Sequence, residues 1–122
     1  MEKVLNIKGG AYRVLFSAEE IQAKIRELAE RLKVDYGNAA KPPILLIVLT
    51  GGLYFGVDLS KQLDQIGLRH HVDTVGLKLN HGPLNFLVDY SGFSLDKNWI
   101  VGYGLDSEQA YRGLKDIYQK ID

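Results

Sequence analysis

The chain has 122 residues, which fits one domain over residues 1–122 and leaves little room for a second. Fifteen Lys and Arg residues balance fifteen Asp and Glu residues, so no basic field indicates nucleic acid as a partner. The absence of cysteine excludes a disulfide framework, a thiolate zinc site and a cysteine nucleophile. No apolar run approaches the roughly 18 residues of a membrane span, and the first residues lack a signal-peptide core. We therefore expect a soluble, cytoplasmic domain.

The first third of the chain predicts a short strand over residues 12–16 and a helix over residues 18–36. Ser17 stands three residues before Glu20, which is the spacing of a capping box at a helix start. Apolar residues then recur at helical intervals, at Ile21, Ile25, Leu28 and Leu32.

An uninterrupted apolar run, Ile44–Leu49, predicts a strand in the middle of a parallel sheet, covered by helices on both faces. Thr50-Gly51-Gly52 ends it, and a helix to about residue 65 and a strand over residues 71–79 follow. A strand, a glycine turn and a helix in this order are typical of an α/β fold.

The last third predicts strands over residues 84–93 and 99–103. Four apolar residues then recur at helical spacing and predict a closing helix over residues 107–121: Ala110, Leu114, Ile117 and Ile121.

The first candidate site is Leu49-Thr50-Gly51-Gly52, at the end of the apolar strand. Ligands of open α/β sheets bind beyond the carboxyl ends of the strands. Two glycines there allow backbone N–H groups to approach an anion, next to the positive end of the following helix. The alternative is a tight turn that binds nothing.

The second candidate site lies in residues 99–112. Trp99, the only tryptophan, could stack on a planar ligand or simply fill a core or edge position. Asp106 follows a strand, where its carboxylate could hold Mg²⁺ or cap a helix. Arg112 offers a planar fork that suits phosphate oxygens, although such a residue can also be only a solvated charge.

Several segments in this order resemble the hypoxanthine (hypoxanthine-guanine) phosphoribosyltransferases. The resemblance covers nearly all of residues 12–118. It is carried by Phe-Ser-Ala-Glu-Glu-Ile, Val-Leu-Thr-Gly-Gly-Leu-Tyr-Phe-Gly-Val-Asp-Leu, Val-Asp-Tyr-Ser-Gly-Phe-Ser-Leu and Ile-Val-Gly-Tyr-Gly-Leu-Asp.

The resemblance implies a role for each candidate residue. Leu49, Thr50, Gly51 and Gly52 would form the pyrophosphate loop, with Thr50 where the family usually has lysine, and Arg112 would contact the pyrophosphate. Trp99 would stack on the purine, the backbone of Ile100 would read its edge, and Asp106 would help to hold Mg²⁺. The family transfers ribose 5-phosphate from phosphoribosyl pyrophosphate to a purine base, and it commonly forms homo-oligomers.

One block of the family's pattern has no counterpart in this sequence. After Lys78 the family continues with a mobile loop, a strand with two acidic residues, a Thr/Gly-rich turn into a helix, and a further strand. Here the chain runs directly into the segment before Val88. We therefore expect a type I phosphoribosyltransferase-like parallel sheet flanked by helices, shortened by about one strand–helix–strand block.

The missing block leaves three functional hypotheses. The chain could be a purine salvage enzyme whose sequence as given omits a segment, and which is catalytically incomplete as written because the acidic pair is absent. It could be a shortened protein that binds a purine base, phosphoribosyl pyrophosphate or pyrophosphate without turnover. It could also be an interaction domain whose uncovered sheet serves oligomerisation.

Overall fold

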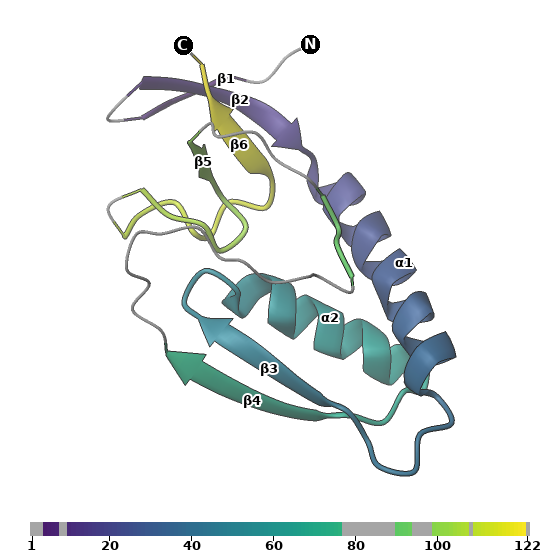
Figure 1. Ribbon diagram of the computed structural model, residues 1–122. Helices are drawn as coiled ribbons and strands as arrows, with labels where there is room; N and C mark the ends of the chain where they lie inside the picture. The colour runs from purple at the N-terminus through teal and green to yellow at the C-terminus, as the bar shows by residue number, and fades with distance from the viewer. Residues whose placement is uncertain (1–3, 8–9, 77–89, 94–98, 108, 122) are drawn as a thin grey trace.

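The computed structural model describes residues 4–7, 10–76, 90–93, 99–107 and 109–121 (Figure 1). Within these residues the elements follow in the order β1 (Val4–Ile7), β2 (Gly10–Phe16), α1 (Ala18–Tyr36), β3 (Ile44–Leu49), α2 (Leu53–Gln65), β4 (His71–Gly76), β5 (Ile100–Val101) and β6 (Ile117–Lys120). An antiparallel sheet lies at one end of the molecule and β3, β4 and α2 lie at the other, while α1 extends along both (Figure 1).

The start of α1 is fixed by two hydrogen-bonding side chains, and its predicted bounds are confirmed. Ser17 Oγ accepts the N–H of Glu20 at 3.1 Å, and Glu20 Oε1 accepts the N–H of Ser17 at 3.3 Å. A buried carboxylate from the other end of the chain adds to this cap, because Asp116 Oδ1 accepts the N–H of Ala18 at 2.6 Å. A negative charge at a helix N-terminus is stabilised by the helix dipole.

The predicted α/β unit is also confirmed, with β3 over the predicted residues and α2 directly after the glycine turn. β3 and β4 pair in parallel from Ile44↔His71 to Leu49↔Gly76. The strand predicted over residues 71–79 is observed to Gly76, and residues 77–79 lie outside the described residues. Gly56 brings α2 close to the sheet, since a Cβ there would lie 2.5 Å from Cγ1 of Ile47.

The predicted closing helix over residues 107–121 is wrong. The described residues of this segment form turns, with positive φ at Gln109 and Tyr111, followed by the strand β6. β6 lies between β2 and β5 in an antiparallel sheet of order β1-β2-β6-β5. Pairing with two strands that are distant in sequence outweighs the helical spacing of the apolar residues.

Two other predicted strands are shorter than expected. β5 covers only two residues of the strand predicted over 99–103, because Gly102 turns the chain away with a φ of 100°. Of the strand predicted over 84–93, residues 90–93 have no regular structure and residues 84–89 lie outside the described residues.

Among the described residues, two apolar clusters form the core. The larger one joins the two helices and Tyr103 and consists of Ile21, Ile25, Leu28, Ala29, Leu59, Leu63, Leu68 and Tyr103. The smaller one lies in the antiparallel sheet and consists of Tyr12, Val101 and Tyr118. In the part of the chain that is described, no helix has the length and apolar character needed to cross a membrane.

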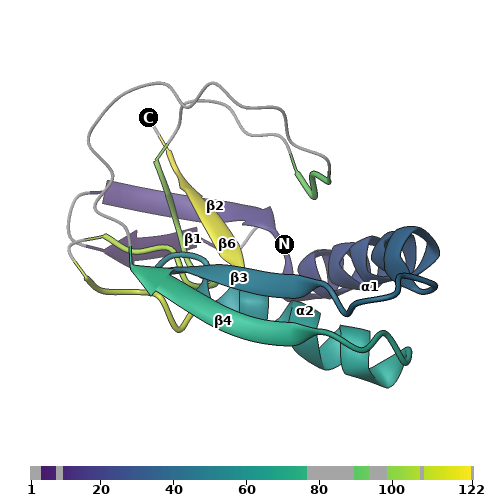
Figure 2. The same ribbon diagram turned by 60° about the horizontal axis from the view of Figure 1, so that its bottom comes forward.

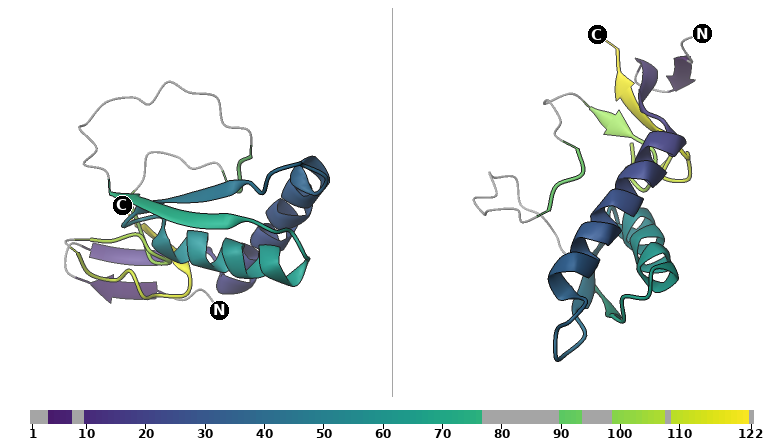
Figure 3. Two further views of the ribbon diagram at one scale, coloured as in Figure 1. Left: turned by 90° about the horizontal axis from the view of Figure 1, so that it is seen from below. Right: turned by 90° about the vertical axis from the view of Figure 1, so that its right-hand side faces the viewer.

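The expectation that β3 is covered on both faces is not met among the described residues. α2 packs on the face of β3 that carries Leu45 and Ile47 (Figures 2 and 3). The opposite face carries Ile44, Leu46 and Val48, which are 68%, 55% and 41% exposed. We call this second face the outer face of β3.

Gly56→Ala is expected to destabilise the protein although alanine favours helix by about 1 kcal/mol. The new methyl group would collide with Ile47, a buried β-branched side chain, and overpacking of this kind costs about 1–3 kcal/mol. Urea unfolding should show a lower midpoint with an unchanged slope. Gly76→Ala is the matched control, because no atom lies within 4 Å of the added Cβ; an equal loss in both variants would contradict this explanation.

Candidate functional site

Some backbone N–H groups of the turn after β3 already donate hydrogen bonds to carbonyl groups nearby in the chain. The N–H of Gly52 donates to the carbonyl of Val48 at 3.1 Å, and the N–H of Leu53 donates to that of Thr50 at 3.1 Å. The peptide bond between Leu49 and Thr50 is cis. Within the described part of the chain the N–H of Gly51 has no such acceptor. The sequence predicted that both glycines could offer an N–H to an anion. In the structure the N–H of Gly51 is the one that remains available.

A second loop, residues 102–106, packs against this turn through glycine. Gly104 has a φ of 92°, and a Cβ there would lie 2.7 Å from the carbonyl oxygen of Gly51. The side chain of Leu105 also lies close to this turn: its Cδ2 is 3.7 Å from the position that a Cβ of Gly51 would occupy. Both the backbone conformation and the space require glycine at position 104.

Arg112 and Asp106 fold the following segment back onto this loop. Arg112 Nη1 donates to the carbonyl of Gly104 at 2.6 Å, and its Nη2 lies 3.4 Å from Asp106 Oδ2. Asp106 Oδ2 also accepts the N–H of Gln109 at 2.8 Å. Asp106 therefore stabilises a turn and not the start of a helix, the alternative role that the sequence allowed. The turn at Leu49–Gly52, Asp106 and Arg112 come together around Gly104.

Tyr103 is a site residue that sequence reasoning missed. Its hydroxyl donates to Asp58 Oδ2 on α2 at 2.7 Å, and Gln22 on α1 donates to the same oxygen at 3.2 Å. Burial, with the hydrogen bond to Asp58, raises the pKa of Tyr103 well above its ordinary value. The sequence signal that could have drawn attention to Tyr103 is the glycine on each side of it, which is typical of an unusual backbone conformation. The φ of Tyr103 is 49°.

Ile100 lies in β5 of the antiparallel sheet, and Trp99 directly precedes it. The Trp99 side chain is 58% exposed, and its carbonyl accepts the N–H of Lys120. Ile100 pairs with Gln119 of β6. Among the described residues, no hydrogen bond or ion pair joins either residue to the turn at 49–52 or to Asp106 and Arg112.

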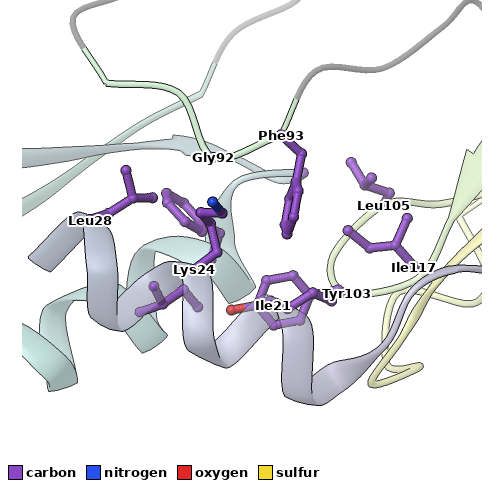
Figure 4. A pocket seen from close by; sticks show the side chains of 11 residues that line it. Ile21, Lys24, Leu28, Gly92, Phe93, Tyr103, Leu105 and Ile117 are labelled. Atoms are coloured by element: carbon purple, nitrogen blue, oxygen red, sulfur yellow. The ribbon is translucent and has the colours of Figure 1, made fainter.

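An apolar pocket of about 190 Å³ adjoins Gly51 (Figure 4). Lys24 and Leu28 of α1 line one wall, and Phe93, Tyr103 and Leu105 line the others. Phe93 stacks on Phe16 with ring centroids 3.9 Å apart, and the ammonium of Lys24 lies 5.6 Å from its ring centroid. These walls suit an apolar group and not a pyrophosphate, so the polar edge of the site is the part formed by Gly51, Asp106 and Arg112.

Comparison with known proteins identifies the family. No family model matches the chain. The hypoxanthine-guanine-xanthine phosphoribosyltransferase of Tritrichomonas foetus is 46% identical to it over 169 aligned positions, which cover 86% of this chain and 89% of the relative. The chain belongs to the hypoxanthine-guanine phosphoribosyltransferase family. It is also 42% identical to the hypoxanthine-guanine phosphoribosyltransferase of Streptococcus thermophilus, over 90% of this chain but only 47%, or about half, of the relative.

Solved structures confirm the fold class. The chain superposes on the enzyme of Leishmania tarentolae in complex with GMP with a TM-score of 0.82 at 20% identity, covering 91% of this chain and 98% of that chain. The hypoxanthine phosphoribosyltransferase of Trypanosoma cruzi in complex with IMP gives 0.78 at 21% identity, covering 88% and 89%. At these identities the likeness concerns the fold alone.

The alignments also measure how much shorter the chain is. The 86% of this chain matched to the Tritrichomonas foetus enzyme is about 105 residues, so about 64 of the 169 aligned positions have no counterpart here. The corresponding number for the enzyme of Lactococcus lactis, with 168 positions and 89% of this chain, is about 59. Both lengths accommodate a strand–helix–strand block, which needs roughly 30 residues or more.

Tyr103→Phe should change how stability depends on alkaline pH. A raised pKa means that the folded protein holds the Tyr103 proton more tightly than the unfolded chain does. The resulting stabilisation is complete below about pH 10 and is lost as the pH rises above it. The free energy of unfolding should therefore fall more steeply above pH 10 in the original protein than in the variant.

At neutral pH, Tyr103→Phe should cost about 1 kcal/mol. Tyr90, whose hydroxyl donates to Asp35, also has a raised pKa, but it is present in both proteins. Urea unfolding from pH 7 to pH 11 measures both effects, and parallel pH profiles for the two proteins would contradict the role of Tyr103.

Proposed function

We propose that this chain is a purine salvage phosphoribosyltransferase domain that keeps the pyrophosphate-binding half of its site. The relatives named above support the reaction class, in which a purine base displaces pyrophosphate from phosphoribosyl pyrophosphate to give a nucleotide. The observation that carries the proposal is the packing of Gly104 against Gly51, with Arg112 bonded to Gly104. It places a cation and a carboxylate beside the carboxyl end of a parallel strand, where α/β sheets bind ligands.

The pyrophosphate-binding residues are Leu49, Thr50, Gly51, Gly52 and Arg112. Gly51 supplies a backbone N–H, and the first turn of α2 supplies donors that no side chain caps. Arg112 supplies a positive charge whose planar geometry matches phosphate oxygens. Gly52 acts by shaping the turn, since its own N–H is committed to Val48.

The residues of the site accommodate Mg²⁺ only as an ion shared with pyrophosphate. The described residues contain no cluster of three or more His, Asp or Glu side chains that could hold a metal alone. Asp106 gives one carboxylate, and Mg²⁺ is commonly bound by one or two carboxylates together with substrate phosphates and water. When bound, the ion would neutralise charge on the pyrophosphate.

The purine-binding residues of the proposal are Trp99 and Ile100. The indole of Trp99 is exposed on the antiparallel sheet, so one ring face can stack on a planar base. Ile100 offers backbone groups next to it. We do not propose that this chain catalyses the reaction, because it has no counterpart of the two acidic residues that the family carries in the missing block.

Arg112→Gln should weaken the binding of magnesium pyrophosphate by about 10- to 100-fold, because a hydrogen bond between charged groups contributes about 1.5–3 kcal/mol. Isothermal titration calorimetry gives the dissociation constants. Lys115→Gln, at an exposed position three residues away, removes the same charge and should bind almost normally.

The Arg112 bond to Gly104 also supports the loop, so the unfolding midpoint of each variant should be measured alongside. Arg112→Lys, which keeps the charge and loses the fork, should bind with intermediate affinity. Equal affinities for Arg112→Gln and the original protein would overturn the role given to Arg112.

Asp106→Asn should remove most of the magnesium dependence of pyrophosphate binding. Asparagine keeps an oxygen that can accept the N–H of Gln109, so the turn is expected to survive. Titrations of pyrophosphate with and without Mg²⁺ should differ strongly for the original protein and little for the variant. An unchanged metal dependence in the variant would exclude Asp106 as the ligand.

Hypoxanthine should quench the fluorescence of Trp99 in a saturable way, since this is the only tryptophan. Incubation with hypoxanthine and phosphoribosyl pyrophosphate should yield no detectable nucleotide. Formation of nucleotide and pyrophosphate would contradict the catalytic incompleteness, whereas the absence of any purine or pyrophosphate response would contradict the proposed function itself.

A further inference from the structure

A half-buried carboxylate, that of Asp58, joins three parts of the fold. Its Oδ2 accepts a hydrogen bond from the hydroxyl of Tyr103 at 2.7 Å and another from the side-chain amide of Gln22 at 3.2 Å. Gln22 belongs to α1, Asp58 to α2 and Tyr103 to the loop at residues 102–106. The two donors offset the cost of withdrawing a charged group from water. Asp58 is therefore the point at which both helices and the second loop of the candidate site meet.

The face of α2 that carries Asp58 also packs against this loop. Tyr54 precedes Asp58 by four residues, a spacing that places both on one face of the helix. The rings of Tyr54 and Tyr103 lie edge to face, with centroids 6.5 Å apart. A Cβ at Gly104 would lie only 3.2 Å from Cδ1 of Tyr54. The first two turns of α2 thus hold the loop by one packing contact and one hydrogen bond.

Arg112 is joined to Tyr103 through the backbone. The N–H of Tyr103 donates to the carbonyl of Leu114 at 2.7 Å, and the N–H of Gly104 donates to that of Arg112 at 2.8 Å. The guanidinium of Arg112 returns a hydrogen bond to the carbonyl of Gly104. These bonds make residues 103–104 and 112–114 one unit, so a contact that holds Tyr103 also sets the place of Arg112.

The helix α2 begins at the turn that supplies the other half of the proposed pyrophosphate site. Gly52 is its N-cap, and no side chain caps the N–H groups of its first turn. One pyrophosphate can contact these N–H groups and Arg112 only if the two are held at a fixed separation. Asp58 lies on the helix that carries the first and bonds the loop that carries the second.

We propose that Asp58 is a positioning residue for pyrophosphate binding, whose bond to Tyr103 sets the place of Arg112 relative to the N-terminus of α2. Asp58 acts through Tyr103 and not by contact with the ligand, and Gln22 steadies the carboxylate from α1. The inference rests on the proposed function and deepens it, because it names what holds the two halves of the site together.

The charge of Asp58 and its positioning role predict opposite effects on pyrophosphate affinity. A carboxylate near an anion site repels the anion, so removing the charge alone should strengthen binding or leave it unchanged. Losing the bond to Tyr103 should weaken binding. Asp58→Asn and Asp58→Leu remove the same charge, but asparagine keeps an oxygen that can accept the Tyr103 hydroxyl. The difference between these two variants therefore isolates the hydrogen bond.

Isothermal titration calorimetry with magnesium pyrophosphate measures this difference. Asp58→Leu should weaken binding by about 10-fold, whereas Asp58→Asn should stay within about 3-fold of the original protein. Asp64→Asn is the matched control on the same helix, since the side chain of Asp64 is 77% exposed, and it should bind normally. Each titration is made below the unfolding midpoint of the variant. Tyr103→Phe breaks the same bond from its other side and should also weaken binding by about 10-fold, so it replaces Asp58→Leu if that variant does not fold.

A double-mutant cycle separates positioning from a general loss of stability. If Asp58 and Tyr103 act through one bond, the double variant Asp58→Leu with Tyr103→Phe should bind no more than about 10-fold more weakly than the original protein. Two independent effects would multiply to about 100-fold.

Weaker binding in Asp58→Leu, near-normal binding in Asp58→Asn and a double variant no worse than either single one would support the proposal. Unchanged or tighter binding in Asp58→Leu would overturn it, and so would effects that multiply. With Tyr103→Phe as the replacement, an affinity equal to that of the original protein would overturn it. An original protein that does not bind magnesium pyrophosphate would refute the proposed function and this inference together, whereas normal binding that is insensitive to Asp58 would refute this inference alone.

Discussion

The close packing of Gly104 against Gly51 is the contact on which the candidate site depends. It joins the turn after β3 to a loop more than 50 residues later, and backbone atoms make it. A side chain at position 104 would separate the two loops, and Asp106 and Arg112 would move away from the end of β3. Arg112 and Tyr103 hold the later loop in place, the first by bonding Gly104 and the second by bonding Asp58. Backbone contact therefore brings the two loops of the site together, and side-chain hydrogen bonds stabilise this arrangement.

The elements that the sequence predicts well are those whose signals are local. The helix of α1 starts at a capping box and continues with a regular apolar stripe, so its bounds could be read from neighbouring residues. β3 was equally clear because six apolar residues stand between a proline and two glycines. The segment 107–121 shows the opposite case. Ile117 pairs with Phe16 of β2, and Tyr118 pairs with Val14 of β2 and Val101 of β5, so these partners lie outside any local window.

The candidate site was predictable in part for the same reason. The end of β3 is a local feature, and its position in an α/β unit made it a candidate ligand site, with a turn that binds nothing as the alternative. Asp106 and Arg112 were candidates from their residue types, with alternatives, and the resemblance gave each an expected role; the structure adds that both are engaged around Gly104 and Gln109. Tyr103 escaped notice because its importance lies in a hydrogen bond to α2, 45 residues earlier. Ile100 belongs to β5 of the antiparallel sheet, with Trp99 directly before it, whereas the turn at Leu49–Gly52 follows β3 of the other sheet.

The strand β3 connects the functional and structural consequences of the shortened chain. In a doubly wound sheet the strand at which the connections reverse direction is an interior strand, and the same reversal opens the crevice in which ligands bind. Ile44, Leu46 and Val48 are exposed on the outer face of β3, and the candidate site at Gly51 directly follows the same strand.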